Sequence, residues 1–529
     1  MRARSGRWAP GHEGLDPGVV PWYRIGGIAP RDNAVLHVVG VALMLVSAGM
    51  VVSAAVGAID GGADVWRDVG SLSLVALAGS LIGVGLWTWT RVPTRQSSAI
   101  SFAAVAWSWL AASVLGAFPF VLSGTIPWSR FDDALFESVS GFSCTGSTIL
   151  TDIEGVPHGV LFFRSLSQWL GGMGLIVLAV AILPALKVGG LEMIAAEAPG
   201  TTPDRLAPRV RQTAIRLWSL YAGVTVVIAV ALIAVGGMSP YDGVAHAFTT
   251  AATGGFSTRG ASIAYFDSAL VEGLLVVGML YCGANFALHW KAVQGDWGVY
   301  RRISEFRLYL GLFVGLVAMI TWVNRSQLTG LSTNLRQSVF NVTTLLTSTG
   351  FGTSDFTRWG PAAQVVLLLV MLPGGMTGST AGGMKILRVQ VLLKHAAREV
   401  RRARHPRAVT PVTLGDTAVP EEIVGRVLAF VFLYLGALLL GGILVVITGA
   451  DPVTGISSAA ATIGNMGPGL GRVGPASTFG EVPRLGRAVL IWLMLFGRLE
   501  IFPTLLMFAA SLRWWDRRRS GVRPVARGR

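Results

Sequence analysis

Residues 340–355 read FNVTTLLTSTGFGTSD, and this stretch decides the fold predicted for the chain. It is too polar to cross a bilayer, yet it lies between two segments that are apolar enough to do so. Its centre is the run Thr347-Ser348-Thr349-Gly350-Phe351. We therefore interpret it as a short helix and a glycine loop that enter the membrane from one side without crossing it.

Three related stretches occur elsewhere in the chain. They read FESVSGFSCTGST at 136–148, AHAFTTAATGGFST at 245–258 and TGISSAAATIGNMG at 454–467. Each is a short run rich in Ser, Thr or Ala that ends at a glycine, and each lies between apolar segments. One such stretch could be an ordinary loop, but four of them predict one site built from four parts.

The composition indicates a polytopic membrane protein. Of the 529 residues 52% are apolar and only 13% are charged, whereas a soluble domain carries about 25% charged residues. Apolar runs of about 20 residues recur along the chain, and each is long enough to span a bilayer. The first run, 34–59, is too long for a signal peptide and lacks a small-residue cleavage pattern near its end.

The net charge of +15 could suggest a nucleic-acid partner, but the positions of the charges argue against one. Each basic cluster adjoins an apolar span, and alternate loops are poor in Lys and Arg, which is the positive-inside pattern. We expect anionic membrane lipid at these clusters instead. The pattern places the chain in the inner (cytoplasmic) membrane with both termini cytoplasmic. The two cysteines, Cys144 and Cys282, cannot form a disulfide framework or a zinc site by themselves, and we interpret both as unpaired thiols.

The predicted fold is an all-α polytopic membrane protein with about ten transmembrane helices. Four units of span, pore helix, glycine loop and span surround a pseudo-fourfold pore, and their starts lie on the order of 100 residues apart. The expected parts are a cytoplasmic arm at 1–33, an accessory pair of spans at 34–95, repeats at 96–200, 201–300, 301–410 and 411–512, and a basic cytoplasmic tail at 513–529. The spans expected within the repeats are 100–122, 160–183, 214–235, 270–288, 308–323, an apolar segment from 362, 423–446 and 488–512.

Four glycine loops around one axis are suited to binding a dehydrated cation. Irregular backbone at membrane depth is tolerated where it lines a watery cavity, and inward carbonyls can replace the hydration shell of an ion. The loops contain no carboxylate at 144–147, 253–256 or 347–351, which favours an alkali cation over a divalent one. Close helix packing is the alternative role of such Gly and Thr residues. The candidate filter residues are Thr145, Gly146, Thr253, Gly254, Gly255, Ser348, Thr349, Gly350, Thr462, Ile463, Gly464 and Asn465.

The segment PGGMTGSTAGG at 373–383 interrupts the second span of the third repeat. Proline removes a donor and glycine frees the backbone, so a continuous helix is not expected there. We expect a helix broken at mid-membrane with a loop that lines the cavity below the filter, and a hinge without pore contact is the alternative. The candidate residues are Gly374, Gly375, Gly378, Gly382, Gly383 and Lys385.

Arg498 lies well inside the last predicted span. A charge at that depth is costly and is a functional hypothesis by default. The alternative is a structural contact, either with Glu500 of a neighbouring chain or with a backbone carbonyl.

Several motifs carry a resemblance to a known family. The four loops, QWLGGMG at 168–174, GGMTGSTAGGMK at 374–385 and GRLEI at 497–501 resemble the TrkH branch of the TrkH/KtrB potassium transporter superfamily, and the resemblance covers about 34–512. It implies that potassium is the transported ion, that Gly146, Gly255, Gly350 and Gly464 are the filter glycines, that 373–383 is an intramembrane gate, and that Arg498 faces the pore below the filter with Lys385 helping to hold the gate. Cys144 departs from the family pattern, in which a threonine is more usual.

The resemblance also implies a homodimer and a cytosolic ring of nucleotide-binding regulatory subunits, called TrkA, for which 385–407 is a candidate contact. Lipid headgroup binding is the alternative role of that basic segment. We expect no bound nucleotide on this chain, because it has no P-loop and the run Gly171–Gly174 lacks the context of a dinucleotide fingerprint.

Two other functional classes fit the sequence less well. A cation-coupled secondary transporter would also use discontinuous helices, often in inverted repeats, whereas these repeats have one handedness. An enzyme is not expected, since His37, His246 and His289 lie on different segments with no carboxylate at ligand spacing. Passive flux and flux coupled to protons or sodium are both compatible with the sequence.

Overall fold

The computed structural model describes residues 33–60, 65–91, 98–181, 206–326, 330–407, 410–415, 417–501 and 504. The predicted basic tail and all but the last residue of the predicted N-terminal arm lie outside these ranges. The described part is mostly helical, as predicted, and its regular elements are helices apart from two short strands.

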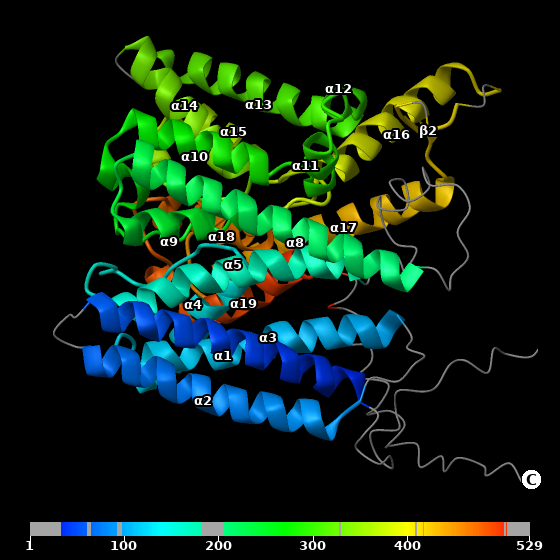
Figure 1. Cartoon of the computed structure of the whole chain (residues 1–529). Coiled ribbons are helices and arrows are strands. Elements are labelled where there is room, and N and C mark those ends of the chain that lie inside the picture. Colours follow the sequence, from blue (N-terminus) through cyan, green and yellow to red (C-terminus); the bar gives the residue numbers. More distant parts are fainter. Residues whose placement is uncertain are drawn as a thin grey trace, which may run out of the picture.

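The first helices form one flank of the molecule. Helices α1 (Ala34–Asp60) and α2 (Val65–Trp89) lie side by side and pack against α3 (Ser98–Leu122) and α5 (His158–Ala181), with the short α4 (Phe131–Phe142) between α3 and α5 (Figure 1). The Asp68 carboxylate on α2 accepts hydrogen bonds from the backbone N–H groups of Gly159 (2.6 Å) and Val160 (3.0 Å) in the first turn of α5. An acceptor at a helix N-terminus is stabilising, so Asp68 ties the accessory pair to the first repeat.

The other three repeats follow the same order of elements. The second contains α8 (Leu206–Val230) with a π-helical continuation (Ala231–Val235), α9 (Pro240–Ala251), α10 (Ala269–Cys282) and α11 (Phe286–Val293). The third contains α12 (Val299–Arg302), α13 (Ser304–Val323), α14 (Leu331–Leu346), α15 (Pro361–Val370) and α16 (Ile386–Arg404). A two-residue hairpin, β1 (Thr413–Leu414) with β2 (Thr417–Ala418), leads into α17 (Glu421–Ile447), α18 (Pro452–Ile463) and α19 (Arg484–Arg498).

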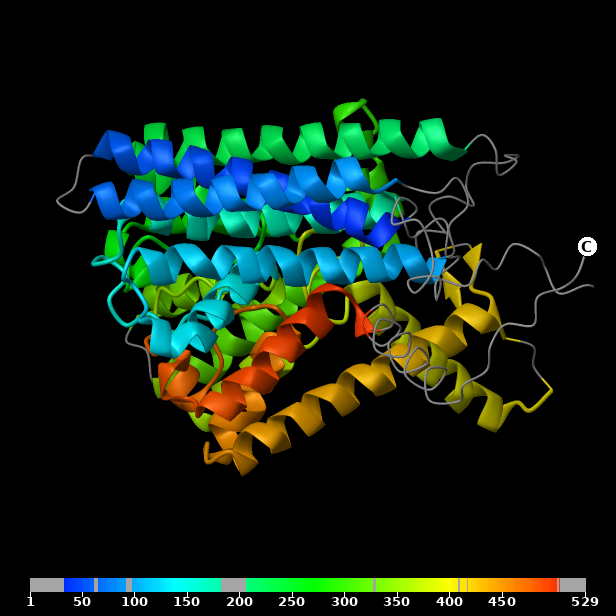
Figure 2. The ribbon, with the colours of Figure 1, turned by 90° about the horizontal axis from the view of Figure 1, so that it is seen from below.

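The short helices are the re-entrant elements. Helices α4, α9 and α18 have 12 residues each, about 18 Å at 1.5 Å per residue, whereas the hydrocarbon core is about 30 Å thick. The N-terminus of α9 is capped by Ser239 and that of α18 by Asp451, and each has a proline in its first turn. The short helices cluster toward one end of the bundle, while α16 and the start of α17 project from the opposite end (Figures 1 and 2).

Within the described ranges, six helices are long and apolar enough to cross a membrane, namely α1, α2, α3, α8, α13 and α17. A seventh span is possible only as a broken pair, because α10 and α11 meet at a bend of 98°. The prediction of a continuous span at 270–288 is therefore wrong. Gly283 ends α10, and the Asn285 side chain starts α11 by accepting a 2.7 Å hydrogen bond from the Ala287 N–H.

Two further spans are interrupted. The segment from 362 forms only the ten-residue α15 before the 373–383 loop, so the predicted break is confirmed. Of the predicted span at 488–512 the structure describes 488–501 and 504, and within this part α19 ends at Arg498 and Glu500 has a positive φ of 60°. Most residues after Ile501 lie outside the described part.

Candidate functional site

The four re-entrant helices end in loops of the same backbone shape. We call these loops 1 to 4, at 143–148, 252–257, 347–352 and 464–469. In each, a residue with left-handed φ is followed two positions later by a glycine with φ between 75° and 86°. The pairs are Cys144 with Gly146, Thr253 with Gly255, Ser348 with Gly350, and Asn465 with Gly467. The repeated sequence pattern thus corresponds to a repeated conformation.

The predicted register of loop 4 is wrong. Gly464 has a φ of −76° at the end of α18, and Thr462 and Ile463 belong to the last turn of that helix. The counterpart of Gly146, Gly255 and Gly350 is Gly467. The shift arises because α18 continues through the Thr-Ile-Gly run, and Asn465 then takes the left-handed turn that asparagine tolerates well.

The four loops form a closed ring. A methyl group on Gly146 would overlap the carbonyl oxygen of Gly254, one on Gly255 that of Thr349, and one on Gly350 that of Met466. A methyl group on Gly467 would lie 3.1 Å from the carbonyl oxygen of Thr145, so the series of contacts returns to loop 1. Each glycine has a φ that favours glycine, and at Gly146, Gly255 and Gly350 the close approach of the next loop also excludes a side chain.

Side chains close the ring between loops 4 and 1. The Asn465 amide donates to Thr145 Oγ1 (3.0 Å) and to the Met494 carbonyl on α19 (2.9 Å). Ser147 Oγ donates to the Gly467 carbonyl (3.0 Å). Residues 320 positions apart are thus joined directly.

A cavity adjoins the ring, and the four ring glycines are part of its wall. It is lined by residues of every loop and of the segments that follow them, including Gly146, Gly255, Gly350 and Gly467. Hydroxyl and backbone groups dominate this lining, and Arg164 and Arg259 are its charged residues. Among the residues that the structure describes, no Asp or Glu lines this cavity.

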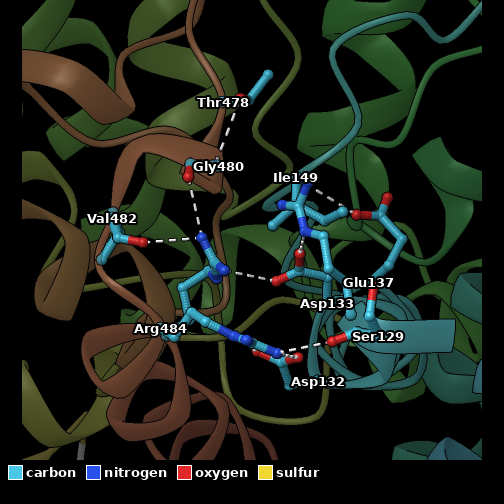
Figure 3. A network of polar contacts seen from close by, with 11 residues as sticks. Ser129, Asp132, Asp133, Glu137, Ile149, Thr478, Gly480, Val482 and Arg484 are labelled. Atoms are coloured by element: carbon cyan, nitrogen blue, oxygen red, sulfur yellow. Dashed lines mark hydrogen bonds and ion pairs between the residues drawn. The ribbon is translucent and has the colours of Figure 1, made fainter. Parts of the chain in front are cut away.

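Buried ion pairs hold the loops from outside. Arg164 Nε lies 2.6 Å from Glu137 Oε1, and both side chains are buried. The Glu137 carboxylate also accepts from the Ile149 N–H (3.0 Å) just after loop 1, as Figure 3 shows. Arg164 reaches loop 2 as well, donating to the Ser257 carbonyl (3.0 Å) and lying 3.5 Å from the centre of the Phe256 ring. This pair therefore connects loops 1 and 2.

A second network connects the first and last repeats. Asp133 on α4 lies 2.7 Å from Arg487 on α19, and Arg487 also donates to the carbonyls of Gly480 (2.9 Å) and Val482 (2.8 Å). At the surface, Arg484 Nε donates to Asp132 Oδ2 (2.9 Å), as drawn in Figure 3. Helices α4 and α19 therefore meet where the ring closes.

The 373–383 loop packs against loop 3 and the end of α9. The Gly382 N–H donates to Ser348 Oγ (2.6 Å) in loop 3, and Thr380 Oγ1 donates to the Ala251 carbonyl (2.9 Å) at the end of α9. Gly374, Gly378 and Gly383 have positive φ, whereas Gly375 and Gly382 are glycines because backbone of Gly283 and Gly464 approaches them closely. The structure thus brings all five predicted glycines into one loop beneath the ring.

Arg498 contacts this loop. Its Nη1 donates to the Thr380 carbonyl (2.9 Å) and its Nη2 to the Gly171 carbonyl (2.8 Å), and the residue is 2% exposed. Lys385 Nζ donates to the Ala381 carbonyl in the same loop. Within this chain Glu500 pairs with Arg388 at 2.7 Å. Arg498 and Lys385 are therefore joined to the loop by backbone carbonyls.

Two contacts of the loop were not predicted. At the break between α10 and α11, the Gly283 carbonyl accepts from the Met376 N–H (2.9 Å). Glu305 Oε1, in the first turn of α13, accepts from the N–H groups of Thr377 (2.7 Å) and Leu387 (3.1 Å). A glycine near an asparagine inside an apolar run was an available signal for the break, and an acid close to Arg301, Arg302 and Arg307 was one for Glu305.

Comparison with known proteins gives consistent matches. A family model described as TrkH, cation transport protein, matches residues 75–321 and 306–516. The Trk system potassium uptake protein TrkH of Escherichia coli K12 is 38% identical over 487 residues, covering 90% of this chain and 99% of that protein. Its namesake from Halomonas elongata is 38% identical over 492 residues, covering 90% and 98%.

A solved structure agrees with the fold. The crystal structure of the potassium transporter TrkH from Vibrio parahaemolyticus superimposes with a TM-score of 0.81 at 34% identity, covering 89% of this chain and 97% of that one. The family match and the relatives each extend over most of the chain. The chain belongs to the TrkH family of cation transport proteins.

Proposed function

We propose that this chain carries potassium into the cell across the cytoplasmic membrane, through a filter formed by loops 1 to 4. The observation that carries the proposal is the closed ring, in which each loop glycine lies against the carbonyl of the next loop. The relatives are named potassium uptake proteins, which supports the choice of ion.

The filter works by replacing water around the ion. Carbonyl and hydroxyl oxygens of the four loops take the place of the hydration shell, and the absence of acidic residues from the cavity lining favours a monovalent cation. Asn465, Gln168 and the pair of Glu137 with Arg164 hold the backbone in place, so the oxygens do not have to reorganise when an ion enters.

The 373–383 loop is the gate. It lies under the ring in contact with Ser348 and Ala251, and Arg498 holds it through the Thr380 carbonyl. The fixed positive charge of Arg498 raises the barrier for a cation leaving the filter. Opening requires the loop to move away from the axis. This movement breaks the hydrogen bonds from Met376 N–H to the Gly283 carbonyl and from Thr377 N–H to the Glu305 carboxylate.

The cytoplasmic face provides the regulatory contact. Arg401, Arg402 and Arg404 are exposed near the end of α16, which projects from the bundle, and they suit a cytosolic nucleotide-binding ring of the TrkA type. We also propose that the protein forms a homodimer, that both termini are cytoplasmic and that anionic lipid binds at the basic clusters. Nucleotide binds only to the regulatory partner, and the chain divides into the four repeats given above.

A cation-coupled secondary transporter is the second candidate. Two broken helices, α10 with α11 and α15 with α16, are the observation in its favour, because discontinuous helices line the sites of such transporters. Coupling predicts potassium accumulation driven by an imposed proton or sodium gradient, whereas a channel-like pore equilibrates potassium regardless of such a gradient.

The test is cation flux in proteoliposomes that contain the full chain alone, with Gly350→Ser as the variant and Gly223→Ser as its control. A side chain at Gly350 meets Met466 and Pro468, whereas a side chain at Gly223 has nothing within 4 Å. We expect potassium and rubidium flux above sodium flux, lost in Gly350→Ser and kept in Gly223→Ser. If the chain alone is closed, Arg498→Ala restores flux. The absence of cation flux in both the wild-type protein and Arg498→Ala would refute the proposal, and so would a sodium flux equal to the potassium flux.

A further inference from the structure

Loop 2 differs from the other three in one position. Between the left-handed residue and the glycine, loops 1, 3 and 4 carry Thr145, Thr349 and Met466, whereas loop 2 carries Gly254. The φ of Gly254 is not positive, so its backbone shape does not require a glycine. The reason must lie in what surrounds it.

Gln168 on α5 occupies that place. Its side chain is fully buried, its Nε2–H donates to the Gly254 carbonyl (2.6 Å), and its Oε1 accepts from the Phe256 N–H (3.1 Å). The two bonds lie on either side of Gly255, the glycine of the ring. One amide therefore fixes loop 2 before and after its closest approach to loop 3.

The side chain also explains the glycine. A Cβ on Gly254 would lie 2.5 Å from both Cδ and Oε1 of Gln168. The backbone carbonyl of Gln168 in turn accepts a hydrogen bond from Cys144 Sγ–H (3.1 Å) in loop 1. Gln168 thus contacts two neighbouring loops and fills the volume that a side chain fills in the other three.

We propose that Gln168 is a specificity-determining positioning residue of the ring, an inference that rests on the proposed function. A carbonyl filter discriminates between ions by the spacing and field strength of its oxygens. The Gln168 amide holds the Gly254 oxygen in place and uses part of its accepting capacity, so this corner of the ring cannot contract around the smaller sodium ion. Loss of the amide raises sodium passage more than it changes potassium passage.

The test compares Gln168→Leu and Gln168→Glu with a matched control, Gln364→Leu. Gln364 also bonds two backbone groups with its amide, donating to the carbonyls of Thr357 (2.7 Å) and Trp359 (2.8 Å), but it lies outside the four loops. We expect the sodium-to-potassium flux ratio to rise by about threefold to tenfold in both Gln168 variants, the range that one or two lost hydrogen bonds correspond to. The ratio should stay unchanged in Gln364→Leu.

A double-mutant comparison separates positioning from general damage. Gly254→Ala clashes with Gln168, so it should lower potassium flux in the native background and do so far less in Gln168→Ala, where the space is open. Additive effects would contradict the assigned contact. Gln168→Glu has nearly the native shape and keeps the experiment informative if the smaller side chains prevent folding.

The outcomes distinguish the inference from the function on which it rests. A wild-type protein that passes sodium as freely as potassium overturns the proposed function. A selective wild-type protein whose flux ratio is unchanged in folded Gln168→Leu and Gln168→Glu overturns only the role of Gln168. A raised ratio in the Gln364→Leu control as well would show that selectivity responds to any amide that bonds two backbone groups, which also overturns the role of Gln168.

Discussion

Asp133 on α4 and Arg487 on α19 form an ion pair of 2.7 Å, with side chains 0% and 6% exposed. They come from the first and last repeats, so the pair lies where the ring of four closes. Arg487 also donates to two carbonyls of the segment that precedes α19, and Asp133 also pairs with Arg130, whose side chain is 49% exposed.

Arg487→Met should strongly destabilise the protein. Losing one partner of a buried ion pair costs roughly 3–5 kcal/mol where the remaining charge has no other partner, and at Asp133 the pair with Arg130 offsets part of that cost. We expect a lowered midpoint of thermal unfolding in detergent, measured by tryptophan fluorescence. The control is Arg358→Met, because Arg358 pairs with Asp355 at 3.1 Å but is 85% exposed. Equal midpoints for the two variants would show that the buried pair contributes no more than a surface one.

The register of loop 4 can be tested by comparing two glycines. Gly467 has φ 83°, where alanine costs roughly 1–2 kcal/mol, whereas Gly464 has ordinary helical φ. Gly467→Ala should therefore reduce rubidium uptake by proteoliposomes more than Gly464→Ala does. The reverse order would support the register expected from the Thr-Ile-Gly run.

The four loops show which parts of the site could be predicted from the sequence. Loops 1 to 3 were located because Thr-Gly or Gly-Gly directly follows each polar helix, and Gly146, Gly255 and Gly350 were all placed correctly in the turns. Loop 4 contains two glycines, and the choice between them depends on the residue at which α18 ends. Helix ends are uncertain by one or two residues, so the sequence does not decide between the two glycines. Asn465 at the left-handed position was the available signal.

Contacts between residues far apart in the chain could not be predicted from the sequence. Gln168 was noted only as part of a motif, and its bonds to Gly254 and Phe256 span more than 80 residues. The break at Gly283 was hidden because the flanking segments are apolar enough to read as one span. By contrast, the break at 373–383 was predictable, since its proline and glycines act locally.

Arg498→Ala should raise potassium flux through the chain without its regulatory partner. The substitution removes a positive charge below the ring and frees the Thr380 carbonyl, so both the electrostatic barrier and the hold on the loop are lost. Arg498→Lys keeps the charge but cannot reproduce both bonds, and we expect an intermediate flux. Unchanged flux in folded Arg498→Ala protein would remove Arg498 from the gate.

Asp68→Ala should loosen the accessory pair without changing ion preference. The carboxylate caps α5 from another helix, and loss of a cap costs roughly 0.5–2 kcal/mol. We expect a lower unfolding midpoint together with a native potassium-to-sodium flux ratio in reconstituted protein. An altered ratio would mean that α1 and α2 act on the filter, and an unchanged midpoint would mean that the cap is dispensable.

The most direct test of the central claim is the position of the ion. We would determine the structure in rubidium and measure anomalous scattering. The account predicts a peak on the axis of the ring, at the level of the carbonyls of Thr145, Gly254, Thr349 and Met466. A peak elsewhere along the pore, with none inside the ring in a preparation that transports rubidium, would contradict it.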